Sequence, residues 1–230
     1  MIESPLTTLS VFHFAPGRRL WPFVAMGWGR FLLRGHHGLR FVKLMGCGQG
    51  IGFTRAPDFG RYALLAVWDH ETEARAFLER SDLMRRYGDH ATRIATLLLK
   101  TLSARGSWGG PGHGNPFLPA DQEGAGTGRM AVLTRATIRP RHLVAFWDHV
   151  PSVRARLGQA PGLVASIGIG EAPFIRQATF SVWQNLEAMR SFAYGDGEHL
   201  KVVELTRRRR WYSEDLFARF AILEMIGDFP

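Results

Sequence analysis

Residues Tyr62–Trp68 read YALLAVW, and residues Ala178–Trp183 read ATFSVW. The first run is apolar almost throughout, which is typical of a β-strand that is covered on both faces. Both runs end in Val-Trp, and the two tryptophans are 183 − 68 = 115 residues apart. This spacing indicates two copies of one structural unit, each built around a buried strand.

Further matches support the repeat. At the same offset of 115, Arg75 corresponds to Arg190 and Phe77 to Phe192. Allowing small differences in loop length, two more pairs correspond: Pro16 with Pro140, and Gly46-x-Gly48 with Gly168-x-Gly170. In each half the pattern runs strand, helix, strand, strand, helix, strand, which is the ferredoxin-like unit.

The predicted elements follow from hydrophobic periodicity. The expected strands are Leu6–Phe14, Leu39–Met45, Tyr62–Trp68 and Ile94–Leu102 in the first half, and Met130–Ile138, Leu163–Ile169, Ala178–Trp183 and Phe217–Ile226 in the second. Helices are expected over Leu20–Leu32, after Asp69 as the capping residue, over Leu143–Leu157, and, broken, within Asn185–Tyr212.

Residues 105–128 contain eight glycines and three prolines, which predicts a linker or a long surface loop. The sequence therefore predicts an α+β fold with tandem ferredoxin-like repeats, residues 1–104 and 129–230, forming a fused dimeric α+β barrel. Its two four-stranded sheets face each other, and helices cover the outside.

Composition narrows the class of protein. The 230 residues are 46% hydrophobic and 21% charged, as in an ordinary soluble domain. The formal net charge of +9 predicts attraction to anionic partners, but no recognised nucleic-acid motif accompanies it, so no nucleic-acid partner is expected. The lone Cys47 excludes an internal disulfide and fits a reducing compartment. We expect a cytoplasmic protein, in peripheral contact with the inner face of the membrane.

The segment FAYGDGEHL indicates the start of a helix that carries a histidine. Asp196 is a suitable N-cap, which places His199 in the first turn, where the helix dipole favours the neutral imidazole that binds metals. Val203, Thr206 and Arg210 share the helix face of His199, at spacings of four, three and four. These residues suit a haem with acidic propionates; the alternative is a histidine that only caps or packs the helix.

The repeat favours a ligand role for this histidine. At the offset of 115, His199 corresponds to Met84, so the histidine belongs to one half only. The arginine run that ends at Arg210 points in several directions around a helix. We expect it mainly to contribute surface charge, with at most one arginine on a propionate.

With these residues in view, the chain resembles the spheroidene monooxygenase family of carotenoid biosynthesis over nearly its whole length. The resemblance lies in LSVFHF with RRLWPF, in FVKLMGCGQGIGFT, in YALLAVW, and in FAYGDGEHL followed by RRRRWYSEDLFARFAIL. It implies a haem-dependent enzyme that uses O2 and an external electron donor to introduce hydroxy and then keto oxygen into an acyclic carotenoid. Haem-binding relatives of this barrel take a proximal histidine from a helix of the C-terminal half. The resemblance thus implies haem b with His199 on the iron.

Two other readings stay open: another haem-barrel enzyme, such as an aldoxime dehydratase-like lyase on a small substrate, and a non-catalytic haem- or ligand-binding protein. Candidate catalytic groups of a distal pocket are His13, Lys43 and Arg135, all on predicted strands. Cys47 is a second candidate for an iron ligand, set against the commoner role of a small buried hydrophobe. The oligomeric state is open.

Overall fold

A computed structural model describes residues 5–110, 114–119, 128–172, 174–195 and 210–229. Eight antiparallel strands form one closed barrel in the order β1-β3-β2-β6-β7-β5-β8-β4. The strands are β1 (Leu6–His13), β2 (Leu39–Gly48), β3 (Pro57–Trp68), β4 (Arg93–Gly106), β5 (Met130–Ile138), β6 (Leu163–Ala172), β7 (Arg176–Trp183) and β8 (Tyr212–Ile226). The predicted fold class is confirmed.

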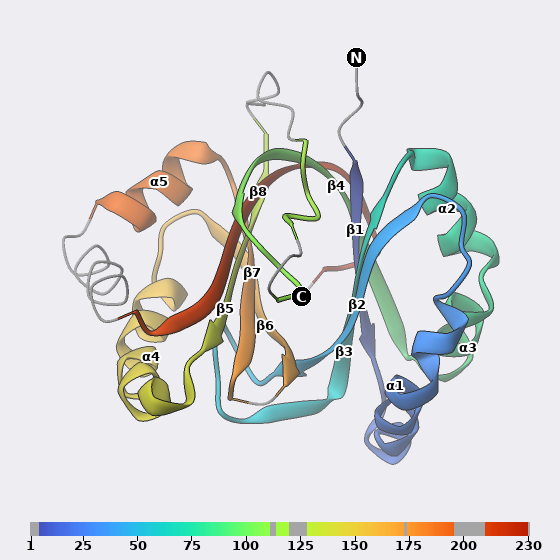
Figure 1. Cartoon of the computed structure of the whole chain (residues 1–230), viewed down its shortest axis with the longest axis horizontal. Helices are drawn as coiled ribbons and strands as arrows, with labels where there is room; N and C mark the ends of the chain where they lie inside the picture. The colour runs from blue at the N-terminus through green and yellow to red at the C-terminus, as the bar shows by residue number, and fades with distance from the viewer. Residues whose placement is uncertain (1–4, 111–113, 120–127, 173, 196–209, 230) are drawn as a thin grey trace.

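The helices lie outside the barrel in two groups (Figure 1). The first group covers β1–β4 and comprises α1 (Leu20–Leu32), α2 (Glu71–Arg80) and α3 (Asp82–His90). The second group covers the other four strands and comprises α4 (Leu143–Gly158) and α5 (Leu186–Tyr194). Short 3-10 turns, Pro16–Arg18 and Pro140–His142, precede α1 and α4. Among the described residues no helix has the length and apolar character needed to cross a membrane.

The pairing registers confirm the internal repeat at the level of single residues. Leu6 of β1 lies opposite Trp68, and Met130 of β5 lies opposite Trp183. Phe12 lies opposite Tyr62, as Ala136 lies opposite Gln177. Residues of β1 and β5 are therefore related by an offset of 136 − 12 = 124, and those of β3 and β7 by 115. That the two halves superpose as whole units stays a prediction.

The YALLAVW strand is buried on both faces, as expected. Leu65 and Val67 pack into the core inside the barrel, whereas Leu64 and Trp68 pack beneath the helices of the first half. Because strand side chains alternate between faces, this one apolar run contributes side chains both to the core inside the barrel and to the core beneath the helices.

Several predicted element boundaries need correction; β3, for example, begins at Pro57 rather than at Tyr62. Asp69 does not cap α2: the N-cap residue is His70, without a side-chain cap bond, and the Asp69 carboxylate instead accepts a hydrogen bond from Arg40. The last strand begins at Tyr212, five residues earlier than expected. A polar start, Tyr212–Asp215, hid this extension from a search for apolar runs.

Part of the predicted surface loop is buried. β4 continues to Gly106, and the following chain places Trp108 and Phe117 in the barrel core with 2% and 0% of their surface exposed. The Trp108 indole N–H donates to Glu171, and the Phe117 ring centroid lies 5.2 Å from that of Phe220. We call Trp108 and Phe117 the barrel plug. Isolated aromatic residues in a Gly/Pro-rich segment have no periodicity that could predict it.

Candidate functional site

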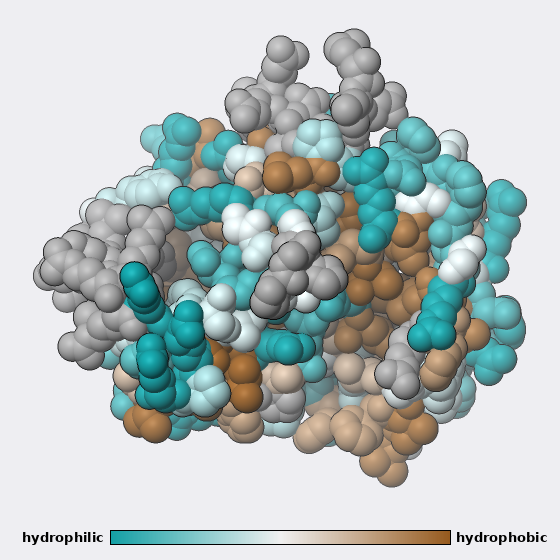
Figure 2. Space-filling view, in the orientation of Figure 1, coloured by the Kyte–Doolittle hydropathy of each residue, from teal (hydrophilic) through white to brown (hydrophobic). Residues whose placement is uncertain are grey.

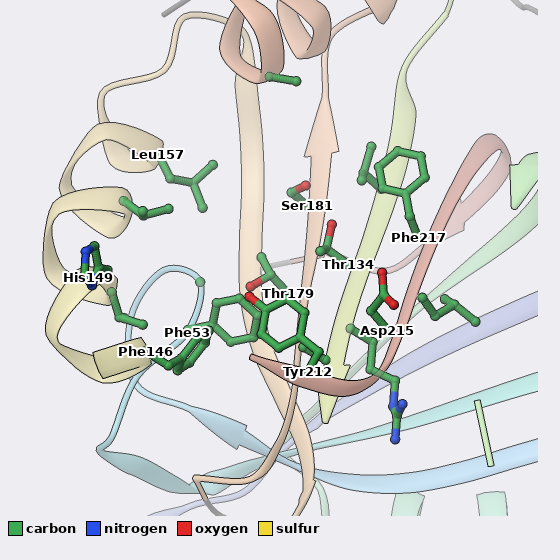
Figure 3. A pocket seen from close by; sticks show the side chains of 18 of the residues that line it. Phe53, Thr134, Phe146, His149, Leu157, Thr179, Ser181, Tyr212, Asp215 and Phe217 are labelled. Atoms are coloured by element: carbon green, nitrogen blue, oxygen red, sulfur yellow. The ribbon is translucent and has the colours of Figure 1, made fainter. Parts of the chain in front are cut away.

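A pocket of about 640 Å³ lies between the second sheet and its helices. Such a volume is in the range of small-molecule and cofactor sites. Small and mostly polar side chains of β5 and β7 form its floor, and apolar side chains of α4 and α5 form the opposite wall (Figure 3). The floor includes Thr134, Ala136, Thr179 and Ser181; the wall includes Phe146, Val150, Val153, Leu157, Met189 and Phe192.

The repeat explains why the corresponding space is filled in the first half. The first-half counterpart of Ala136 is Phe12, by the offset of 124, and that of Thr179 is Leu64, by the offset of 115. Phe12 and Leu64 are 0% and 2% exposed, in a core that also includes Tyr87 of α3. The smaller residues of the second half leave the corresponding volume open.

The first half also contributes to the pocket. The loop between β2 and β3 reaches across to α4, where Phe53 packs edge-to-face on Phe146 with ring centroids 5.7 Å apart. The Arg154 guanidinium anchors this loop by donating to the Ile51 carbonyl oxygen at 2.8 Å. A side chain at Gly168 of β6 would clash with the carbonyl of Gly52, so this glycine permits the close approach. The GxG pair of the second half thus has a structural role beside the pocket.

His149 and Tyr212 are titratable groups on the pocket wall. The Nδ1 atom of His149 lies 2.7 Å from the Ala145 carbonyl oxygen, which can only accept, so Nδ1 carries the proton. In the neutral imidazole the Nε2 atom is then free to accept a proton or bind a metal. Burial, and then the nearby Asp215 carboxylate, raise the pKa of Tyr212, which therefore stays a hydrogen-bond donor.

The indole N–H of Trp211 is a further group that a ligand could use. Trp211 is fully buried and lines the pocket, and its Nε1 atom has no hydrogen-bond partner among the described residues. Its ring stacks beside His142 and lies edge-on to His149, with centroids 6.5 and 5.4 Å apart.

Of the four residues predicted to bind the cofactor, Arg210 is exposed and lines the pocket. His199, Val203 and Thr206 lie outside the described residues. The chain enters that segment after Gly195 and leaves it at Arg210, and Ala193 and Arg210 both line the pocket.

The structure does not bring the three candidate catalytic residues together. His13 ends β1, and Arg135 lies near the end of β5; three antiparallel pairings separate these strands, so the two residues lie toward opposite ends of the barrel. Burial, then Arg93 and Arg61, lower the pKa of His13. Lys43 and His13 are absent from the pocket lining, which includes Arg135. A catalytic role for each stays a prediction.

Lys43 and Arg135 belong to a charge network that contacts Trp108 of the barrel plug. Lys43 Nζ lies 2.7 Å from Glu171, and the Arg135 guanidinium lies 3.2 Å from Glu171 and 2.6 Å from Glu214. Trp108 stacks on Arg135, with the guanidinium carbon 5.0 Å from the ring centroid. Burial alone would raise the pKa of Glu171, but hydrogen bonds from Lys43 and Trp108 outweigh it and hold the pKa below its usual value.

Cys47 lies in the barrel core rather than in the pocket. Burial raises the pKa of its thiol to about 12. A neutral, buried thiol outside the pocket behaves as a small hydrophobe.

Three curated proteins named spheroidene monooxygenase match almost the full length of the chain. The one from Rhodobacter capsulatus is 38% identical over 225 residues, which cover 97% of this chain and 92% of that protein. Those from Rubrivivax gelatinosus and Cereibacter sphaeroides are 37% and 35% identical, covering 95% and 96% of this chain and 82% and 67% of theirs. The chain belongs to the spheroidene monooxygenase family. The resemblance predicted from the sequence motifs is thereby confirmed.

No protein-family profile matches the chain. Among solved structures, an aldoxime dehydratase in complex with butyraldoxime has a TM-score of 0.58 at 11% identity, covering 96% of this chain and 79% of that one. A second aldoxime dehydratase has a TM-score of 0.57 at 12% identity, covering 98% and 85%. At these identities the likeness shows a shared fold.

Proposed function

We propose that this member of the family is a haem-dependent monooxygenase that uses O2 to introduce hydroxy and then keto oxygen into an acyclic carotenoid. The observation that carries the proposal is the pocket of about 640 Å³ in one half of a repeated barrel. The curated relatives, named spheroidene monooxygenases, support the carotenoid as substrate. Haem b supplies the oxygen-activating chemistry when bound, and an external donor supplies electrons.

The residues of the pocket fit a haem. Apolar side chains of α4 and α5 suit the macrocycle, and Arg139, Arg154 and Arg210 supply cations for two propionates. The buried indole N–H of Trp211 lacks a partner among the described residues and would gain one from a bound polar group. The chain's own residues would orient the polyene, exclude water and keep a proton on Tyr212.

We propose His199 as the proximal ligand of the iron, with Val203 and Thr206 beside it. Arg210, which directly follows this segment, and Ala193, three residues before its start, both line the pocket, which supports the assignment. His149 is the competing ligand, because its Nδ1–H bond to Ala145 leaves Nε2 free.

Haem loading of two variants tests the assignment. His199→Ala should lose most bound haem, measured as loss of the Soret band at unchanged far-UV circular dichroism, whereas His149→Ala should retain it. Loss of haem only in His149→Ala would transfer the ligand role to that residue. A wild-type protein that takes up no haem would refute the haem proposal.

Product analysis tests the reaction. Wild type expressed in a host that makes acyclic carotenoids should convert them to hydroxy and keto products, and the haem-free variant should not. Conversion of a small aldoxime to a nitrile without carotenoid oxidation would favour the lyase reading. Haem binding without either reaction would favour a non-catalytic protein.

A further inference from the structure

Helix α1 carries a row of apolar side chains that face outward. Leu20, Phe23, Val24 and Phe31 are 81%, 60%, 62% and 52% exposed. Their spacing places them along one side of the helix. Phe59 of β3, 52% exposed, extends the row, with its ring centroid 6.5 Å from that of Phe23. Figure 2 shows hydrophobic residues gathered at the lower right, where Figure 1 places α1.

The barrel itself does not require this apolar row. Helix α4 follows its own 3-10 turn in the second half as α1 does in the first. Three α1 positions, Leu20, Val24 and Phe31, have exposed α4 counterparts at the offset of 124, namely Val144, Asp148 and Ala155. Only one of these counterparts is a large apolar residue. The outward face of α1 therefore carries an apolar row that the outward face of α4 lacks.

The charged residues in the stretch of sequence that contains α1 are all basic, and Asp58, the carboxylate next to Phe59, pairs with Arg61 at 2.7 Å. Residues 4–57 contain seven lysines and arginines and no aspartate or glutamate. Arg18 and Arg19 are exposed immediately before α1. Arg34, also exposed, follows it, with its guanidinium carbon 5.1 Å from the centroid of the Phe31 ring. An apolar row with cations at both ends is complementary to an anionic lipid surface, where headgroups bind the cations and acyl chains the apolar row.

We propose that α1 is a membrane-docking helix, which lies in the interface of an anionic bilayer with its apolar row inserted. The 13 residues of α1 rise about 20 Å, shorter than a hydrocarbon core of about 30 Å, which fits a helix lying in the interface. The proposal stands on α1 and its flanking arginines, and it does not depend on haem or on the identity of the substrate.

Vesicle sedimentation tests the proposal with the full chain. Wild type should bind vesicles that contain about one third phosphatidylglycerol more tightly than pure phosphatidylcholine vesicles, and less tightly as salt screens the arginines. Joint substitution of Phe23→Glu and Val24→Glu should weaken binding more than about tenfold, because binding then no longer transfers these two apolar side chains from water into the bilayer. Both side chains are exposed, so far-UV circular dichroism and haem content should not change.

Two further variants complete the design. Val144→Glu on α4 is the matched control and should bind as wild type does. Arg18→Gln with Arg19→Gln should weaken binding to the anionic vesicles only. Wild-type binding by the Phe23/Val24 double variant would overturn the proposal, as would an equal loss in Val144→Glu. A third outcome would also overturn it: the wild type does not bind vesicles but forms a dimer, and the double variant is monomeric. The apolar row would then be an interface with a second copy of the chain.

Discussion

Replacement of Trp108 by alanine tests whether the barrel plug holds the fold together. The side chain is 2% exposed inside the barrel, and its indole N–H donates to Glu171 at 2.9 Å. Its ring also stacks on Arg135 and lies 5.2 Å from the ring of Phe41. The substitution therefore removes a buried aromatic side chain and one partner of a charged carboxylate.

The expected cost follows from this burial. Large-to-small changes at buried tryptophan cost about 3–5 kcal/mol of unfolding free energy. For a chain of this size each kcal/mol lowers the thermal midpoint by about 2–4 °C, so Trp108→Ala should lower it by about 6–20 °C. Trp108→Phe keeps an aromatic ring and loses the N–H donor. Because Glu171 keeps Lys43 and Arg135, this variant should cost only about 1 kcal/mol.

Thermal unfolding followed by circular dichroism measures both variants. Leu118→Ala is the control from the same segment: Leu118 is 47% exposed, and its replacement should change the midpoint by less than about 2 °C. If Trp108→Ala shifts the midpoint no more than this control does, the segment after β4 is not part of the core, and the reasoning is wrong.

Three more outcomes follow from the structure. Ala136→Phe combined with Thr179→Leu places the larger first-half residues in the pocket. The double variant should take up haem more than about tenfold more weakly, without a lower thermal midpoint for the haem-free protein. Full haem loading would contradict the assignment of the pocket. Glu214→Gln should cost about 1.5–3 kcal/mol, because Arg135 loses a charged partner at 2.6 Å but keeps Glu171. Burial would raise the pKa of Glu214, but hydrogen bonds from Gly110 and Arg135 outweigh it and hold the pKa below its usual value. The ionised carboxylate therefore stabilises the folded state above about pH 4.5, and this stabilisation is lost as the pH falls through the folded-state pKa. The pH–stability profile of the variant should lack this loss. Cys47, with its pKa of about 12, should react with a thiol reagent at pH 8 only after unfolding; rapid labelling of the native protein would show that it is accessible.

The barrel could be predicted from the sequence because its signals are local and occur twice. A run such as YALLAVW identifies a doubly covered strand without knowledge of its neighbours. The recurrence of Val-Trp at positions 68 and 183 then fixes two equivalent units. The strand order follows from the ferredoxin-like pattern, and closure follows from the need to cover the inner faces of two sheets.

The pocket could not be predicted in the same way, because it depends on which residues face each other across strands. A strand residue changes face with a shift of one position, so the pairing of Phe12 with Tyr62 and of Ala136 with Gln177 had to be known first. The plug and the Lys43–Glu171–Arg135 network depend on contacts between distant segments. His149 could have been noticed as a histidine on the helix that follows Pro140, but only the structure places it beside the pocket.

The placement of the pocket in one half has a physical advantage that a fused barrel alone provides. In the first half Phe12, Leu64 and Tyr87 fill the space between sheet and helices and are almost fully buried. Replacing a buried phenylalanine by alanine costs about 3–5 kcal/mol, which is a large part of the stability of an ordinary domain. In a barrel built from two identical chains, any change that opens a pocket occurs twice, and so does its cost. In this chain Ala136 and Thr179 open the second half while the first half keeps its packed core, so the barrel bears the cost of the pocket once.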